Sequence, residues 1–266
     1  MFKIATWNVN SLKMRLPQLL PWLTRTKPDI VALQETKVTD ENFPHQAIIE
    51  AGYQVVFAGQ KTFNGVAILS RAPAQEVTTE IPDWQDTQRR LIAATIAGVR
   101  VINLYVPNGE NVESEKYRYK LQWLAKVHDF LQQQLAQYTN LVVLGDFNIA
   151  PEDRDVHDPE RWRGHVLCSE PERQAFRELL AIGLQDTFRL FPEHPVPYTW
   201  WDYRGGALWR NEGLRIDHIL ASAALAEHCT QCEVDKSLRK QKPPSDHAAI
   251  VATFSPTTTH EILSVD

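Results

Sequence analysis

Several features of an exported, membrane-bound or disulfide-linked protein are scarce or missing in this sequence. The 266 residues include three cysteines, a small odd number that gives no disulfide framework and suits a reducing cytoplasm. No run reaches the roughly 18 apolar residues of a membrane span, and the N-terminus MFKIATWNVN turns polar too early for a signal peptide. No linker rich in Pro, Gly or Ser is present. We therefore expect a cytoplasmic protein without a membrane partner, with one domain at residues 1–254 and a flexible tail at 255–266.

A strong positive charge is also missing. The formal net charge is −5 at pH 7, which argues weakly against nucleic acid because phosphate binding usually leaves a basic footprint. An enzyme that binds a divalent cation needs its own carboxylates, however, and these lower the total charge. Each local cluster of basic residues is more often an ordinary solvated surface than a binding site. Three such clusters are Arg89–Arg90, then Lys116, Arg118 and Lys120, and finally Lys236, Arg239, Lys240 and Lys242.

What the sequence does contain is a series of short apolar segments separated by turn residues. They predict strands at 2–9, 28–35, 52–59, 64–71, 91–98, 99–106, 140–146, 214–222 and 247–254. Leucine spacing predicts a helix at 16–26 with Pro17 in its first turn, a long amphipathic helix at 117–135, and a helix at 172–183 that ends at Gly183. Residues 151–170 are expected to form a long polar loop. The pattern favours an α/β sandwich, with sheets in the middle and helices outside.

Acidic residues recur at the ends of these predicted strands. One carboxylate in such a place usually belongs to a turn, but four in one domain indicate that they converge on a common rim. Asparagines near strand ends are common turn formers, and they can also donate to a phosphoryl oxygen without adding charge. Mg²⁺ prefers oxygen ligands, few of them from protein, with substrate phosphate completing the shell. The residues concerned are Glu35, Asp146, Asp217, Asp246, Asn8, Asn10 and Asn148.

The segment PPSDHAAIV, residues 243–251, places Asp246 and His247 at the mouth of an apolar strand. Burial of a charge is costly without a partner, so these residues are either solvated or face a cation, a phosphate or another charge. His247 is a candidate acid, base or charged donor to phosphate, and a carboxylate such as Asp217 would favour its imidazolium form. A nucleophilic triad of three consecutive residues is not expected, because such triads assemble from distant positions.

An ordered set of motifs resembles the exonuclease III family, the bacterial abasic-site endonucleases. The resemblance runs from about residue 2 to about residue 254, and any one of its tetrapeptides alone would be a weak signal. It implies a four-layer α/β sandwich and Mg²⁺-dependent hydrolysis of DNA phosphodiesters, with Mn²⁺ able to substitute. The motifs are TWNVNSL, LQETK, GQKTFNGVAILSR, QRRLIAATI, NLYVPNGE, GDFNIAPEDRDV, YTWWDYRGG, GLRIDHIL and PSDHA.

The resemblance also implies roles for individual residues. Glu35 matches the metal-binding glutamate, and Asp146, Asn148, Asp246 and Asn10 complete the implied metal site. Asn8 matches an active-site asparagine, and Tyr105 a tyrosine that contacts phosphate. Asp146 matches the residue that activates water or protonates the leaving group, and Asn148 the residue that steadies the transition state. Asp217 is implied to pair with His247, which binds phosphate.

The implied partner is double-stranded DNA with abasic sites or blocked 3′ ends, bound by a monomer. Trp200 and Trp201 are expected to project from a loop and fill the gap that a missing base leaves, because apolar wedges act in this way in other DNA-binding proteins. The alternative is that either tryptophan packs in the core. The loop at 157–168 departs most from the family. Arg89, Arg90, Lys120, Arg204 and His247 complete the predicted DNA contacts, with Arg210 beside them.

Three other interpretations remain open at this stage. A phosphodiesterase or phosphatase of the same fold could act on lipid or inositol phosphates, but this would need a membrane-facing apolar or basic loop. A non-catalytic binding module would need lost catalytic residues, whereas every matched position is filled. Cys229, Cys232 and His228 resemble half of a zinc site, but no second pair exists, so a structural role is favoured. We therefore expect abasic-site endonuclease activity together with 3′→5′ exonuclease and 3′-phosphatase or phosphodiesterase activity.

Overall fold

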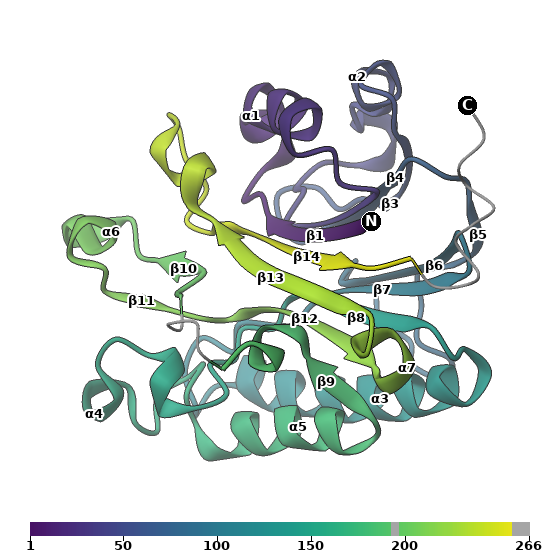
Figure 1. Cartoon of the computed structure of the whole chain (residues 1–266). Helices are drawn as coiled ribbons and strands as arrows, with labels where there is room; N and C mark the ends of the chain where they lie inside the picture. Colours follow the sequence, from purple (N-terminus) through teal and green to yellow (C-terminus); the bar gives the residue numbers. More distant parts are fainter. Residues whose placement is uncertain (193–196, 257–266) are drawn as a thin grey trace.

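Two β-sheets lie face to face at the centre of the computed structural model, and helices cover the outer side of each sheet (Figure 1). The structure describes residues 1–192 and 197–256. The predicted four-layer α/β sandwich is confirmed. No helix in these described ranges is long and apolar enough to cross a membrane. In the predicted tail, Ser255 donates its backbone N–H to the His228 carbonyl at 2.8 Å. Residues 257–266 of the predicted tail lie outside the described residues.

The first sheet has six strands in the order β13-β14-β1-β2-β4-β3. β1 and β2 run parallel, and the other neighbouring pairs are antiparallel. Helices α1 and α2 lie along its outer side (Figure 1). The bounds are Phe2–Asn8 for β1, Ile30–Gln34 for β2, Gln54–Ala58 for β3, Val66–Ser70 for β4, Cys229–Asp235 for β13, Ala249–Phe254 for β14, Leu12–Thr26 for α1 and His45–Glu50 for α2.

The second sheet also has six strands, in the order β5-β6-β7-β8-β12-β9. β7 and β8 run parallel, the other pairs are antiparallel, and helices α3 and α5 cover the outer side (Figure 1). The bounds are Ala74–Thr78 for β5, Leu91–Ile96 for β6, Val99–Tyr105 for β7, Leu141–Asp146 for β8, Leu184–Asp186 for β9, Asp217–Ser222 for β12, Glu115–Gln137 for α3 and Glu170–Ala181 for α5.

Three short helices and a two-stranded ribbon complete the fold. The ribbon pairs Trp200 with Leu214 and lies at one end of the sandwich, beside α6 (Figure 1). The segment expected to be a long polar loop contains a 3₁₀ turn, Asp153–Asp155, and the helix α4, so it is more ordered than predicted. The remaining bounds are Pro159–Trp162 for α4, Ala207–Arg210 for α6, Ala223–Ala226 for α7, Trp200–Trp201 for β10 and Gly213–Leu214 for β11.

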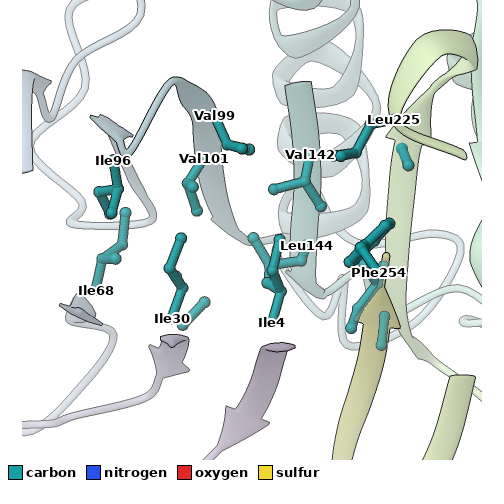
Figure 2. Close-up of a cluster of buried hydrophobic side chains, with 14 of the residues drawn as sticks. Ile4, Ile30, Ile68, Ile96, Val99, Val101, Val142, Leu144, Leu225 and Phe254 are labelled. Atoms are coloured by element: carbon teal, nitrogen blue, oxygen red, sulfur yellow. The ribbon is translucent and has the colours of Figure 1, made fainter. Parts of the chain in front are cut away.

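The hydrophobic core between the sheets is formed by alternate residues along the strands, whose side chains point inward (Figure 2). Ile4 and Ile30 of the first sheet face Val101 and Leu144 of the second, and all four side chains are fully buried. Burial of one such side chain stabilises the fold by about 1.5–3 kcal/mol. This core fixes the two sheets relative to each other, and it therefore fixes the strand ends that carry the polar residues.

All three predicted helices differ in detail from the expectation, and α5 begins at Glu170 and ends at Ala181, two residues before Gly183. Helix α1 begins at Leu12, so Pro17 lies in its interior rather than in its first turn. The earlier start is favoured because Leu12 is fully buried in the hydrophobic cluster between the first sheet and its outer helices. Helix α3 is two residues longer at each end than predicted, and a different face is buried, because Leu121 is only partly buried whereas Lys120 is fully buried.

Candidate active site

The predicted acidic rim exists, and the strand directions explain it. β1 and β2 run parallel, so Asn8 and Glu35 emerge at the same edge of the first sheet. In the second sheet, Asp217 begins β12 directly opposite Asp146 at the end of β8. Since the two sheets are stacked, these two edges face each other, and side chains far apart in the sequence meet.

Asn8 joins the two sheets at this edge. Its side-chain amide donates to Glu35 Oε1 at 2.8 Å and to Asp146 Oδ2 at 2.8 Å, and Asn8 is fully buried. Lys37 Nζ lies 2.9 Å from Glu35 Oε2. The amide and the ammonium group hold two carboxylates close together although the carboxylates repel each other. Asn8 therefore acts as a neutral bridge between the acids of the two sheets.

His247 is held by Asp217, as the sequence suggested. Its Nδ1 lies 2.8 Å from Asp217 Oδ2, and its Nε2 lies 3.7 Å from Asp146 Oδ2. Burial alone would lower the pKa of His247, but the charges of Asp217, Asp146 and Asp246 raise it to about 10. The ring is therefore an imidazolium at neutral pH, both of its nitrogens carry protons, and Nδ1 donates to Asp217.

Asp146 lies at the centre of the site. Burial raises its pKa to about 7, against the opposing attraction of His247. Its Oδ1 accepts the backbone N–H of Asn148 at 2.9 Å, a contact that Asn148 makes in the left-handed backbone conformation with φ of 50°. A carboxylate that titrates near neutral pH can either accept or release a proton during a reaction.

Tyr105 and Asn148 add two neutral donors to the site. Burial, followed by the charges of Glu35 and Asp146, raises the pKa of Tyr105 well above its ordinary value, so its hydroxyl stays protonated. The Arg90 guanidinium lies 4.7 Å from the centre of the Tyr105 ring. The Asn148 amide donates to the Val106 carbonyl at 2.9 Å. Both side chains line the same edge of the second sheet.

Asp246 anchors the opposite side of the site. Its Oδ1 accepts from Asn10 Nδ2, and its Oδ2 accepts from Trp200 Nε1, each at 3.0 Å. Burial alone would raise the pKa of Asp246, but His247 and these hydrogen bonds keep it below its ordinary value. Lys37 Nζ donates to Asn10 Oδ1 at 2.6 Å. Asp246 is therefore ionised and fully engaged by neighbouring donors.

The site fits a hard divalent cation. In the described ranges, ligand atoms of Glu35, Asp146 and His247 lie within 4.8 Å of one another, and Asp246 is not part of that group. Because both nitrogens of the His247 imidazolium carry protons, we assign the ligand atoms to the two carboxylates. Carboxylate oxygens are the ligands that Mg²⁺ and Mn²⁺ prefer. Cys229 and Cys232 are outside this group; Cys232 is buried and accepts a hydrogen bond from Thr187.

Two predicted DNA contacts are wrong. Lys120 is fully buried in an ion pair with Glu172, and its Nζ donates to the carbonyls of Asn148 at 2.7 Å and Asn108 at 3.1 Å. Lys120 therefore connects the loops that contain Asn108 and Asn148 from the interior of the protein, and it cannot contact a DNA phosphate. Trp201 is also fully buried, and its indole N–H donates to Asn211. Trp201 is a core residue because successive side chains of β10 point to opposite faces.

Of the other predicted DNA contacts, His247 is buried in the site, and the rest lie at or near the surface. Trp200 is half-buried, and its ring meets Trp162 of α4 edge to face with centroids 6.5 Å apart. It is a fixed wall of the site rather than a free wedge. Arg204 is exposed, and Arg89 and Arg90 are partly buried, with Arg89 4.0 Å from Glu80. Arg210 is also exposed and forms an ion pair with Glu212 at 2.6 Å.

Several residues of the site escaped the sequence analysis. Asn108 donates to Asn148 Oδ1 at 3.2 Å, and Lys37 contacts both Glu35 and Asn10. Asn108 follows a strand just as Asn8 and Asn148 do, so the same reasoning applied to NLYVPNG could have found it. Trp162 gave no such signal, because its contact with Trp200 depends on how a loop folds.

Taken together, the stacked sheets and this edge define the class of hydrolases that cleave phosphate esters with a bound divalent cation. The chain belongs to the endonuclease/exonuclease/phosphatase family, whose family model matches residues 5–247. It is 36% identical to the exodeoxyribonuclease III of Haemophilus influenzae over 95% of this chain and 99% of that protein. The resemblance to exonuclease III is therefore confirmed.

Solved structures of relatives have the same fold. A 3′ phosphatase from Neisseria bound to a product DNA hairpin is 47% identical, with a TM-score of 0.95, and the match covers 96% of this chain and 100% of that chain. An AP endonuclease from Archaeoglobus fulgidus is 43% identical, with a TM-score of 0.92, over 96% of this chain and 100% of that chain. Similar folds thus occur in one protein named as a 3′ phosphatase and in another named as an AP endonuclease.

Proposed function

We propose that this protein is a DNA repair nuclease that uses Mg²⁺, with Mn²⁺ able to substitute. Its substrates are double-stranded DNA with abasic sites and DNA with blocked 3′ ends, and it acts as a monomer in the cytoplasm. The main supporting observation is the edge where Asn8 bridges Glu35 and Asp146 at 2.8 Å each, beside the His247–Asp217 pair. This arrangement places cation ligands next to a positively charged hydrogen-bond donor.

Glu35 and Asp146 would hold the cation, with Asn10, Asn148 and Asp246 around it. A divalent cation at this place would polarise a phosphoryl oxygen and lower the pKa of a bound water molecule. Asn8 keeps the two carboxylate groups at a fixed separation. We assign to Asp146 the transfer of a proton to or from the attacking water or the leaving oxygen, because its buried carboxylate lies 3.7 Å from His247 Nε2 at the centre of the site.

The remaining residues stabilise charge on the phosphate. The His247 imidazolium donates from Nε2 to a phosphoryl oxygen, while Asp217 orients the ring and keeps it charged. The Tyr105 hydroxyl and the Asn148 amide are neutral donors on the same edge. Donors that are fixed before the reaction stabilise the developing charge without reorganising, and the loss of one typically costs about 10²–10³ in turnover.

Relatives named for different activities support a broad substrate range. One solved neighbour is a 3′ phosphatase, another is an AP endonuclease, and the curated relative is an exodeoxyribonuclease. All three names refer to DNA or to nucleic-acid repair. No comparison favours the alternative reaction on lipid or inositol phosphates.

The test compares initial rates on three substrates: a duplex with one abasic site, a duplex with a 3′-phosphate, and a duplex with intact ends. We expect Mg²⁺-dependent cleavage of the first two to be faster than digestion of the third. Asp146→Asn and His247→Asn should each lower turnover at least about 10²-fold without loss of DNA binding. Full activity in EDTA, or near-normal turnover in both variants, would rule out this assignment of the site.

A further inference from the structure

A groove of about 780 Å³ lies next to the candidate active site and has no role in the reaction described above. Its lining residues come from the segment that contains α6 and from the basic segment 236–244. Both segments lie at the end of the sandwich where β10 and β11 lie (Figure 1). We call it the Trp209 groove. Its lining residues are Asp202, Tyr203, Gly206, Ala207, Leu208, Trp209, Asn211, Lys236, Arg239, Lys240, Gln241, Lys242 and Pro244.

The groove combines an exposed aromatic surface with positive charge. The Trp209 side chain is 90% exposed, and Tyr203 is 52% exposed, which is unusual for residues of this size in a soluble protein. Four of the lining residues are basic and one, Asp202, is acidic. Within the described ranges, neither Lys240 nor Lys242 has an ion-pair partner. The charge of the groove is therefore available for an anionic ligand.

The groove adjoins the candidate active site through Tyr203. Tyr203, which lines the groove, accepts hydrogen bonds at its hydroxyl from Asn10 at 3.3 Å and from Arg15 at 3.0 Å. Asn10 in turn donates to Asp246. The same hydroxyl donates to the carbonyl of Pro244 at 2.9 Å. Tyr203 thus lines the groove and also contacts Asn10, which holds Asp246 of the candidate active site.

We propose that the Trp209 groove binds an unpaired nucleotide of the DNA substrate, with its base stacked on Trp209 and its phosphates near Lys240 and Lys242. This inference rests on the proposed function. A base inside a duplex already stacks on its neighbours and offers no free face, whereas an unpaired base does. Aromatic side chains beside a basic groove are the usual combination in proteins that bind single strands. The predicted basic cluster at 236–242 is therefore more than an ordinary solvated surface.

The test measures the affinity, without hydrolysis in EDTA, for a blunt duplex and for two extended duplexes, one with a short single-stranded 3′ extension and one with a short 5′ extension. The wild type should bind one extended duplex more tightly than the blunt one. Trp209→Ala should weaken binding of that extended duplex about tenfold, within the usual range for one stacked base. Binding of the blunt duplex should be unchanged, and Trp209→Tyr should restore most of the affinity because it keeps an aromatic face.

Salt dependence tests the charged half of the groove. Lys240→Ala should lower the slope of log affinity against log salt by about 0.7 for the extended duplex, the value for one phosphate contact to a single strand. Lys126→Ala is the matched control, because it removes the same charge from α3, on the outer side of the second sheet. The control variant should keep the wild-type slope.

Two outcomes would overturn the proposal. Trp209→Ala could leave both affinities unchanged or weaken both DNAs equally. Alternatively, the groove variants could lose binding to vesicles of anionic lipid while they keep DNA binding, which would indicate a lipid surface as the ligand. Hydrolysis of the abasic duplex by wild-type protein in Mg²⁺ is measured in parallel. Absent hydrolysis refutes the proposed function, whereas normal hydrolysis with unaffected groove variants refutes only the role of the groove.

Discussion

Replacing Asp217 by asparagine should shift the pH dependence of hydrolysis rather than abolish hydrolysis. Asp217 Oδ2 lies 2.8 Å from His247 Nδ1, and both side chains are buried. Two unit charges with centres about 4 Å apart interact by about 4 kcal/mol at an effective dielectric constant of 20, which corresponds to about 3 pKa units. Asp217, Asp146 and Asp246 raise the pKa of His247 to about 10 against the effect of burial. Without the Asp217 charge it should fall to about 7.

The imidazolium exists below this pKa, so activity that depends on it is present at low pH and is lost as the pH rises through the pKa. At pH 8 only about one tenth of the variant would carry the charged ring, whereas nearly all of the wild type would. We therefore expect turnover about tenfold below wild type at pH 8 and nearly equal turnover at pH 6. The assay is kcat on an abasic duplex at saturating Mg²⁺ from pH 5.5 to 9.

Two controls separate this charge effect from damage to the fold. In the Asp217→Asn variant, the new side chain would keep an oxygen that accepts the His247 Nδ1–H. Its amide nitrogen, however, would replace Asp217 Oδ1, a buried atom without a hydrogen-bond partner among the described residues. An unsatisfied buried donor costs about 1–3 kcal/mol of stability, so the melting temperature must be measured and the assay run well below it. A loss of the same size at every pH would refute the reasoning, because Asp217 would then only orient the ring.

Three further predictions concern the metal, the lesion and stability. Glu35→Ala should raise the Mg²⁺ concentration that gives half-maximal rate, and an unchanged Mg²⁺ titration would exclude Glu35 as a ligand. Trp200→Ala should slow abasic cleavage about tenfold, as expected for one lost aromatic contact, and leave hydrolysis of a small phosphodiester almost unchanged; equal losses, or a large fall in melting temperature, would indicate a structural role. Burial and Arg215 lower the pKa of His218 to about 4, so the unfolded chain binds the extra proton below pH 6.5. The contribution of His218 to stability should fall by about 2 kcal/mol from pH 7 to pH 5, so the difference in the free energy of urea unfolding between the wild type and His218→Gln should change by that amount.

Most of the fold followed from the sequence, and the strands that were missed share a physical cause. The central strands are fully buried on both faces, so they appear as continuous apolar runs such as IVALQ in β2. β13 and β5 are edge strands with exposed polar residues, as in CTQCEVD and AQEVT, and they give no such run. An edge strand forms because a neighbouring strand offers free backbone N–H and C=O groups. The side chains of the edge strand itself give no sign of this pairing in the sequence.

Lys120 shows why the sequence did not predict the burial of one particular residue. Its neighbours Lys116 and Arg118 are exposed, so the sequence alone predicts one basic surface. Lys120, however, lies four residues before Leu124 on the buried face of α3, where Glu172 from α5 compensates its charge. Helical spacing could have indicated burial, but only the packing of α5 against α3 supplies the buried carboxylate that makes it tolerable.

The sequence by itself determined the local elements, the chemical types of the site residues and the family. It placed oxygen ligands and hydrogen-bond donors at strand ends because apolar runs must be buried and their polar ends must leave the core. Only the tertiary structure decided which of these groups meet. Asp246 and His247 adjoin in PPSDHAAIV, yet Asp246 is engaged by Asn10 and Trp200 whereas His247 turns to Asp217. Adjacent residues diverge in this way because successive side chains of an extended chain point to opposite sides.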